Sequence, residues 1–193
     1  NAVFQTSIDS EVMALLINRY SDGDIVQGVI KACARFQGSF ALVVMTADKL
    51  IAVRDPFGIR PLVLGKSLDD TVVASETCAI DSIGGTVERD VKPGEVVVID
   101  AEGEHSYFLP KEKKTASCIF EYVYFARPDS IIDGCSVYES RKEAGRILAK
   151  YCPVDADIVS GVPDSAVVAA RGYSEVSGIP YVEALAKNRY VGR

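Results

Sequence analysis

The last seven residues combine three cations with an aromatic ring and a glycine, a composition suited to holding an anion. They occupy positions 187–193, and the members that could act on a ligand are Lys187, Arg189, Tyr190 and Arg193. Arginine presents a planar fork of N–H donors that matches phosphate, and glycine lets the backbone turn sharply. Basic clusters of this length are also common as solvated surface segments. The pattern leaves two interpretations open, an anion-covering loop and a solvated tail.

A second candidate anion site lies between a short apolar run and a helical pattern. Its residues are Gly161, Val162, Pro163, Asp164 and Ser165. A helix N-terminus presents unpaired backbone N–H groups and the positive end of the helix dipole, and both favour an anion. However, any strand-to-helix turn can carry a glycine with a capping Asp or Ser. The segment alone therefore does not separate a phosphate loop from an ordinary turn.

Three other polar positions could carry chemistry, and each has a simpler structural explanation. Asp9 stands at the start of an expected helix, where it could cap the helix or accept a bond from a substrate ammonium group. Residues 54–61, Arg-Asp-Pro-Phe-Gly-Ile-Arg-Pro, form a dense turn signature whose charged pair we expect to brace the turn. His105 is the single histidine and falls on an expected hairpin, which argues against a histidine-based triad.

The composition narrows the function classes. The chain has 193 residues, 48% of them hydrophobic, and a formal net charge of -6, which argues against a broad nucleic-acid-binding surface. Its longest apolar runs, such as residues 40–45, are far too short to cross a membrane. The five cysteines are widely spaced and form no C-x-x-C pair, so neither a disulfide framework nor a zinc site is expected. We therefore expect partners that are neither nucleic acid nor membrane.

The first half of the sequence predicts two helices followed by short strands. The expected helices cover residues 9–20, 24–35 and, after the first strands, 76–83. The expected strands cover residues 39–45, 50–54, 62–64 and 71–74, with a further hairpin at 96–100 and 105–109. Because consecutive strands usually pair, the first four strands are predicted to form an antiparallel meander.

A polar connector separates this half from a differently patterned one. Lys-Glu-Lys-Lys at 111–114 places the domain boundary between residues 114 and 115, giving domains 1–114 and 115–193. Beyond an aromatic stretch at 121–126, the pattern predicts an amphipathic helix at 137–152, a buried strand at 157–160 and a helix ending near 177. A strand, a glycine turn and a helix are typical of the start of a βαβ unit.

Six segments together resemble the glutamine phosphoribosylpyrophosphate amidotransferase family, over essentially the whole chain. They are residues 6–11, 54–61, 74–79, 122–130, 161–165 and 187–193. The first three are shared more loosely by class II glutamine amidotransferases in general, whereas the last three are specific to the phosphoribosyl member. The resemblance implies the latter part of an αββα N-terminal-nucleophile (class II) glutamine amidotransferase domain, followed by the start of an α/β phosphoribosyltransferase domain.

The activity implied by this resemblance belongs to purine synthesis. A thiol hydrolyses glutamine, and the ammonia is transferred to phosphoribosyl pyrophosphate, giving phosphoribosylamine, pyrophosphate and glutamate. The resemblance also implies Mg2+, a candidate 4Fe-4S cluster, nucleotide feedback inhibitors as further ligands, a cytoplasmic location and a homo-oligomer. We expect the thiol nucleophile, the oxyanion site and the ribose-phosphate strand to lie outside residues 1–193, so that this segment alone is inactive.

The resemblance also assigns roles to individual residues. Asp9 falls where the family binds the α-amino group of glutamine, and residues 161–165 fall on the pyrophosphate loop. Residues 187–193 fall on the first part of a flexible catalytic loop that Tyr190 helps to close. Cys118 falls where some members place one ligand of the iron-sulfur cluster, although a purely structural cysteine is the alternative.

Two other functions remain as alternatives. One is a non-catalytic anion-binding or regulatory module that keeps the site at residues 161–165. The other is a different class II amidotransferase, such as a sugar or asparagine enzyme. Residues 127–130 and 187–193 argue against a different class II amidotransferase, because such an enzyme has no reason to carry these two segments.

Overall fold

The computed structural model describes residues 4–110, 114–188 and 190, and in it the chain forms two compact units. The first unit comprises the described residues up to Ser75 and those from Gly84 to Ser117. The second comprises Glu76–Ile83 and the described residues from Cys118 onward. The domain boundary inferred from the sequence, between residues 114 and 115, did not assign residues 76–83 to the second domain. That boundary stays a prediction. None of the helices in the described ranges combines the length and hydrophobicity needed to cross a bilayer.

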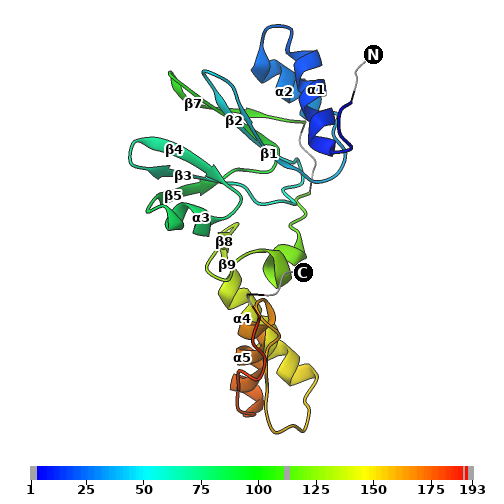
Figure 1. Ribbon diagram of the computed structural model, residues 1–193, viewed down its shortest axis with the longest axis vertical. Helices are drawn as coiled ribbons and strands as arrows, with labels where there is room; N and C mark the ends of the chain where they lie inside the picture. Colours follow the sequence, from blue (N-terminus) through cyan, green and yellow to red (C-terminus); the bar gives the residue numbers. More distant parts are fainter. Residues whose placement is uncertain (1–3, 111–113, 189, 191–193) are drawn as a thin grey trace. The chain divides into compact units, whose positions relative to one another are not determined.

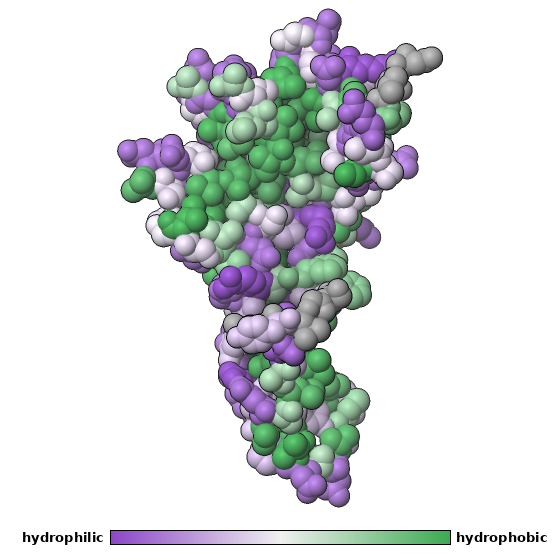
Figure 2. Space-filling view, in the orientation of Figure 1, coloured by the Kyte–Doolittle hydropathy of each residue, from purple (hydrophilic) through white to green (hydrophobic). Residues whose placement is uncertain are grey.

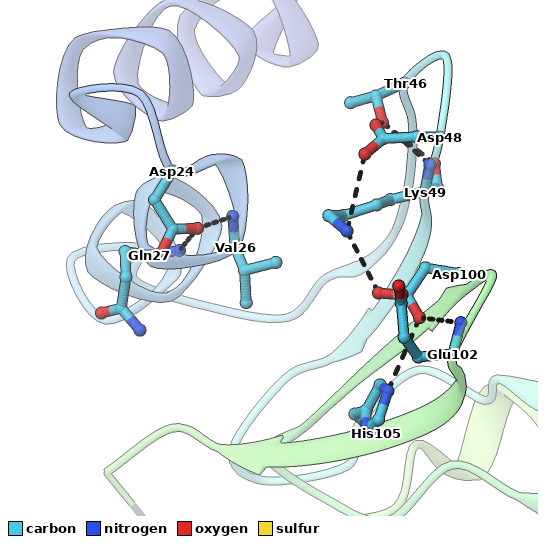
Figure 3. A network of polar contacts seen from close by, with 9 residues as sticks. All are labelled: Asp24, Val26, Gln27, Thr46, Asp48, Lys49, Asp100, Glu102 and His105. Carbon is cyan, nitrogen blue, oxygen red and sulfur yellow. Dashed lines mark hydrogen bonds and ion pairs between the residues drawn. The ribbon is translucent and has the colours of Figure 1, made fainter.

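The first unit begins with a pair of helices, α1 (Asp9–Ser21) and α2 (Ile25–Cys33), close to the predicted ranges. The Asp24 carboxylate caps α2 by accepting from the backbone N–H groups of the second and third residues after it, at 2.9 and 3.2 Å (Figure 3). At Gly28 of α2, a Cβ would lie 2.8 Å from the Ile17 carbonyl oxygen of α1. The glycine therefore allows the two helices to pack closely.

Seven strands of the first unit form two antiparallel sheets. The larger sheet has the order β1-β2-β6-β7, with bounds Ala41–Met45, Leu50–Arg54, Glu95–Asp100 and Gly103–Phe108. The smaller sheet has the order β4-β3-β5, with bounds Asp70–Ala74, Val63–Ser67 and Thr86–Asp90. The predicted antiparallel pairs β1-β2 and β3-β4 are confirmed, but their union into one four-stranded meander is wrong, because β2 pairs with β6 and not with β3. The predicted hairpin around residues 102–103 is confirmed as β6-β7.

Side-chain alternation along β2 and β6 explains why the meander does not form. Ile51 and Val53 belong to one buried cluster with side chains of α1 and α2, whereas Ala52 belongs to another with Leu64 of β3. Successive strand residues point to opposite faces, so the larger sheet lies between the helices and the smaller sheet (Figure 1). A strand buried on both faces reads as a continuous apolar run, which does not reveal its partner.

A polar network joins the turns at one end of the larger sheet (Figure 3). Lys49 Nζ donates to Asp100 Oδ2 at 3.1 Å and also lies 3.5 Å from Asp48 Oδ2. The other oxygen of Asp100 accepts from the Glu102 backbone N–H, and His105 Nε2 lies 3.5 Å from it. The Lys49 ammonium holds the pKa of Asp100 below its ordinary value. The network therefore links the β1-β2 and β6-β7 turns.

The second unit is mainly helical. Its elements are α3 (Thr77–Ser82), the π-helix η1 (Glu121–Phe125), a short hairpin of β8 (Ile131–Ile132) and β9 (Cys135–Ser136), α4 (Val137–Tyr151) and α5 (Ala166–Ser177). α4 and α5 lie side by side (Figure 1), and two glycines set their distance. A Cβ at Gly145 would collide with the Ala169 carbonyl, and one at Gly172 with the Lys142 carbonyl.

The predicted buried strand at 157–160 is wrong. Val159 makes a single parallel bridge with Tyr181, and both Asp157 and Ile158 are exposed. Within the described residues no further strand flanks this bridge, and Val159 and Tyr181 are only half-buried. Val159 precedes α5 in the sequence and Tyr181 follows it. A parallel bridge between them therefore has the connectivity of a βαβ unit.

Candidate functional site

The loop at residues 161–165 lies directly against the start of α5. Gly161 is buried, and a Cβ there would lie 2.6 Å from the Val167 Cα. Only glycine therefore lets the loop pass so close to the first turn of the helix. Ser165 is the N-cap residue, and its side chain makes no capping bond. The first N–H groups of α5 and the Ser165 hydroxyl thus lie at the positive end of the helix dipole, where an anion is stabilised.

The chain beyond Tyr181 returns along this loop and brings the two predicted anion-binding segments together. The Ala184 N–H donates to Ser160 Oγ at 3.2 Å, and Lys187 Nζ lies 3.4 Å from Asp164 Oδ2. The Lys187 and Asp164 side chains are 59% and 76% exposed. An ion pair this exposed contributes little to stability, so Lys187 can exchange Asp164 for an anionic ligand at small cost.

The remaining members of the basic segment are only partly described. Tyr190 is 99% exposed, and its backbone N–H donates to Asn188 Oδ1 at 3.0 Å. Arg189 and Arg193 lie outside the described residues. The role of Tyr190 in closing a loop stays a prediction.

A cavity of about 710 Å³ opens beside Ser165, between η1, α4 and α5. Its walls are mainly apolar, with Tyr122, Val123 and Tyr124 of η1 on one side and Ala166 of α5 on another. The cavity places the aromatic stretch predicted from the sequence next to the candidate phosphate loop. Pockets with apolar walls and few polar groups are typical of small-molecule sites.

Arg141 is a buried cation in this wall that the sequence analysis missed. Its side chain is 4% exposed, and it donates to the carbonyl oxygens of Tyr122 and, at 2.7 Å, Ala126. Burial lowers the pKa of Arg141, because removal from water disfavours the charged form. The sequence carries a signal for the burial of Arg141. Together with Val137, Gly145 and Ala149, which are also buried, it repeats every four residues along one face of α4. A charged residue on the buried stripe of a helix indicates a specific partner.

Asp9 is the first residue of α1, but it does not cap the helix. The N-cap is Ile8, which has no side-chain cap, and Glu11 instead reaches back to accept from the Gln5 and Thr6 N–H groups, both at 2.8 Å. These bonds lower the pKa of Glu11. Among the described residues, the exposed Asp9 carboxylate accepts no hydrogen bond. It is therefore available to a ligand ammonium group.

An apolar groove of about 430 Å³ lies close to Asp9, between α1 and β1. Met13 and Ile17 line one side, and Val43 and Met45 line the other. Figure 2 shows apolar side chains gathered over the strands of this unit, with polar side chains around them. The groove offers shape and hydrophobicity but few polar groups, so it does not by itself identify a ligand.

The loop at residues 54–61 has the predicted bracing role. Arg54 is 1% exposed and donates to three carbonyl oxygens, those of Gly58, Arg60 and Val91, at 3.0, 2.9 and 2.8 Å. Asp55 is fully buried and accepts from the N–H groups of residues 57, 59 and 60. The prediction that this pair braces the turn is confirmed.

The described residues do not assemble a metal site. Cys118 is half-buried and free, and nowhere in residues 4–110, 114–188 and 190 do three or more His, Cys, Asp or Glu side chains come together as ligands would. A 4Fe-4S cluster needs four ligands, so these residues alone do not fit one. The assignment of Cys118 stays a prediction.

Comparison with known proteins covers both units. The glutamine amidotransferase domain family matches residues 1–82. An amidophosphoribosyltransferase of Archaeoglobus fulgidus is 47% identical over 99% of the chain, and the chloroplastic enzyme of Glycine max is 49% identical over all of it. The chain spans only 42% and 34% of the length of these two relatives.

Solved structures give the same result. A structure of glutamine phosphoribosylpyrophosphate amidotransferase from B. subtilis, complexed with ADP and GMP, matches with a TM-score of 0.95 and 46% identity. The match covers all of the chain and 42% of that protein. A structure described as the allosteric regulatory enzyme of purine biosynthesis matches equally well.

Proposed function

Because the chain is homologous to the amidophosphoribosyltransferases along its whole length, we propose that it is part of an enzyme that transfers ammonia from glutamine to phosphoribosyl pyrophosphate. The observation that carries the proposal is the match of both units to one enzyme, at 46% identity and a TM-score of 0.95. The first unit has the fold of a glutamine amidotransferase domain. The second would contribute the phosphoribosyl half of the reaction.

In this proposal the loop at residues 161–165 binds the pyrophosphate group of the substrate. The N–H groups at the start of α5, the Ser165 hydroxyl and Lys187 converge on one exposed region, and all of them favour negative charge. Mg2+ would enter bound to the pyrophosphate group and reduce its charge. Mg2+ that is bound to phosphate needs few protein ligands. Its use is therefore compatible with described residues that do not assemble a metal site of their own.

The chemical step would be a displacement at the anomeric carbon of the ribose. The ammonia nitrogen forms a bond to this carbon while the bond to the pyrophosphate oxygen breaks, and the electron pair leaves with pyrophosphate. The new ammonium group then gives up one proton to the solvent. Negative charge therefore grows on the leaving group. Donors fixed at the start of α5, together with Lys187, would stabilise this charge without reorganising during the reaction.

Asp9 would bind glutamine in the first unit. Its exposed carboxylate lies at the first residue of α1 and is unengaged within the described chain, so it can pair with the α-amino group of the amino acid. We expect Asp9→Asn to raise the KM for glutamine. The same variant should leave synthesis supported by added ammonia unchanged, because that reaction bypasses glutamine.

Nucleotides are candidate regulators of this enzyme, and the support is the B. subtilis relative, whose structure is described as a complex with ADP and GMP. A cytoplasmic location and a homo-oligomer are proposed from the family resemblance alone. Inhibition of the full-length protein by these nucleotides, and its mass in solution, would test this part of the proposal.

The deciding experiment uses the full-length protein that contains this chain. Incubation with glutamine, phosphoribosyl pyrophosphate and Mg2+ should release glutamate and pyrophosphate together, each dependent on both substrates. Binding of phosphoribosyl pyrophosphate without release of either product would instead support the non-catalytic anion-binding module. A different class II amidotransferase is not favoured, because the similarity continues over the whole second unit.

A further inference from the structure

The segment that carries Lys187 runs alongside the candidate phosphate loop with little buried surface of its own. Residues 182–188 are all exposed. The segment meets the chain before α5 through the Ala184 N–H, which donates to Ser160 Oγ at 3.2 Å, and through the ion pair of Lys187 with Asp164. Segments with few buried apolar contacts and solvent-exposed hydrogen bonds open readily. The position of Lys187 therefore depends on polar contacts that hold the segment in place.

Arg171 of α5 contacts the start of this segment. Its guanidinium carbon lies over the Tyr181 ring, 5.3 Å from the ring centre, and its Nη2 lies 3.5 Å from Glu183 Oε1. The Glu183 side chain is 72% exposed, so water screens the ion pair and the ring contact is the more specific of the two. Arg171 thus fastens the first residues of the segment to the helix whose N-terminus forms the candidate anion site.

The order of contacts along the segment leads from Arg171 to Lys187. The segment follows the loop in the same direction, because Tyr181 forms a parallel bridge with Val159 and Lys187 pairs with Asp164 further along. An anchor at the start of the segment therefore restricts where its end can lie. Arg171 itself comes after the first turn of α5, so it is not one of the donors at the helix start.

We propose that Arg171 is a positioning residue for the pyrophosphate site. It holds residues 181–187 against α5 and so keeps the Lys187 ammonium beside the loop at residues 161–165. A segment that is ordered before the ligand arrives loses less conformational freedom on binding, which favours affinity. The inference rests on the proposed function and concerns the second unit alone. Because Arg171 acts through Lys187, its loss should weaken substrate binding only while Lys187 is present.

The test is a double-mutant cycle in the full-length protein. It measures the KM for phosphoribosyl pyrophosphate with added ammonia as the nitrogen donor, so that the reaction does not depend on glutamine. We expect Arg171→Ala to raise this KM by about two- to fivefold and to leave kcat nearly unchanged, because an exposed cation–π contact away from the reacting atoms is lost. In the Lys187→Ala background the same substitution should have no further effect, because one residue acts through the other.

Matched variants separate positioning from general destabilisation. Tyr181→Phe keeps the ring under Arg171 and should preserve the KM, whereas Tyr181→Leu removes the ring and should raise the KM as Arg171→Ala does. Arg35→Ala removes an arginine of the first unit that also lies over a tyrosine, 5.2 Å from the centre of the Tyr20 ring. This control variant should leave the KM for phosphoribosyl pyrophosphate unchanged.

The outcomes distinguish the inference from the proposed function. An unchanged KM in the Arg171→Ala protein would overturn the inference. An equal rise in KM with and without Lys187 would overturn it as well, because Arg171 would then act independently of that lysine. A normal KM in the Lys187→Ala protein would leave Arg171 with nothing to position and would have the same consequence. A wild-type protein that makes no phosphoribosylamine from ammonia would instead defeat the proposed function.

Discussion

Two loops of similar composition have opposite structural environments. The loop at residues 54–61 and the loop at residues 161–165 both carry Gly, Pro and Asp, and both follow an extended segment. In the first, the Arg54 and Asp55 side chains are almost completely buried and bonded to backbone groups of the same unit. In the second, Asp164 is 76% exposed and pairs with a lysine that is itself exposed.

The difference distinguishes a charged side chain that stabilises the fold from one that is available to bind a ligand. A buried charge whose donors or acceptors all have internal partners braces the chain, because breaking any bond leaves a desolvated group. Half-buried donors at a helix start, such as the Ser165 hydroxyl that makes no capping bond, keep their capacity for a ligand. Substitutions at Arg54, Gly161 and Lys187 should separate the two kinds of charge, and the surface network around Asp100 gives a reference for a weak contact.

Replacement of Arg54 should damage folding more than any other change considered. Arg54→Ala leaves three carbonyl oxygens without their donor, two of them in buried bonds, and we expect a loss of about 3–5 kcal/mol in the free energy of unfolding. Urea denaturation followed by circular dichroism measures it. The matched control is Arg19→Ala, an exposed arginine of α1, which should change stability by no more than about 0.5 kcal/mol. Equal effects of the two substitutions would refute the bracing role.

Gly161→Ala should affect catalysis more than stability. The added Cβ would lie 2.6 Å from the Val167 Cα, so the loop must move away from α5. We expect the kcat/KM for phosphoribosyl pyrophosphate to fall by about tenfold or more, because small displacements of positioning groups are costly. Glutamine hydrolysis by the same variant, measured without phosphoribosyl pyrophosphate, serves as the control and should persist. A normal kcat/KM would show that the loop does not contact the substrate.

Lys187→Ala should raise the KM for phosphoribosyl pyrophosphate by about five- to tenfold, since one charge-assisted contact is lost. The steepness of the dependence of KM on salt should decrease as well. Lys150→Ala, at an exposed lysine of α4, is the matched control and should change neither quantity. Identical kinetics for the two variants would remove Lys187 from the site.

The network around Asp100 should give the smallest effect, visible only as a pH dependence of stability. Lys49 lowers the pKa of Asp100 in the folded protein, so its contribution is fully present above the ordinary aspartate pKa of about 4 and is lost as pH falls from there through the lowered pKa. Lys49→Met should therefore lower the Tm slightly at pH 6 and by less at pH 3. A larger difference at pH 3 than at pH 6 would contradict the assigned cause.

Local patterns were sufficient to predict most helices and the β6-β7 hairpin. The helix expected at residues 9–20 is α1, and that at 137–152 is α4, because both carry apolar residues at helical spacing. The fold class was predicted from the family resemblance and is confirmed. The pairing of β2 with β6 was not predictable, because both strands are buried on both faces and their sequences do not distinguish one partner from another.

Contacts between distant parts of the sequence account for what was missed in the site. Residues 161–165 and Lys187 could be identified from composition, but their contact depends on the return of the chain after Tyr181. The contact of Arg171 with the Tyr181 ring likewise depends on the fold of the chain after α5, and no local pattern reports it. Arg141 was detectable in principle, from its place on the buried stripe of α4.

The central claim is that the open loop binds the substrate pyrophosphate and the braced loop does not. Hydrogen exchange of the full-length protein, with and without phosphoribosyl pyrophosphate and Mg2+, tests it directly. The ligand should slow exchange at the backbone amides of residues 161–168 and leave those of residues 54–61 unchanged. No protection at residues 161–168, or protection confined to residues 54–61, would contradict the account.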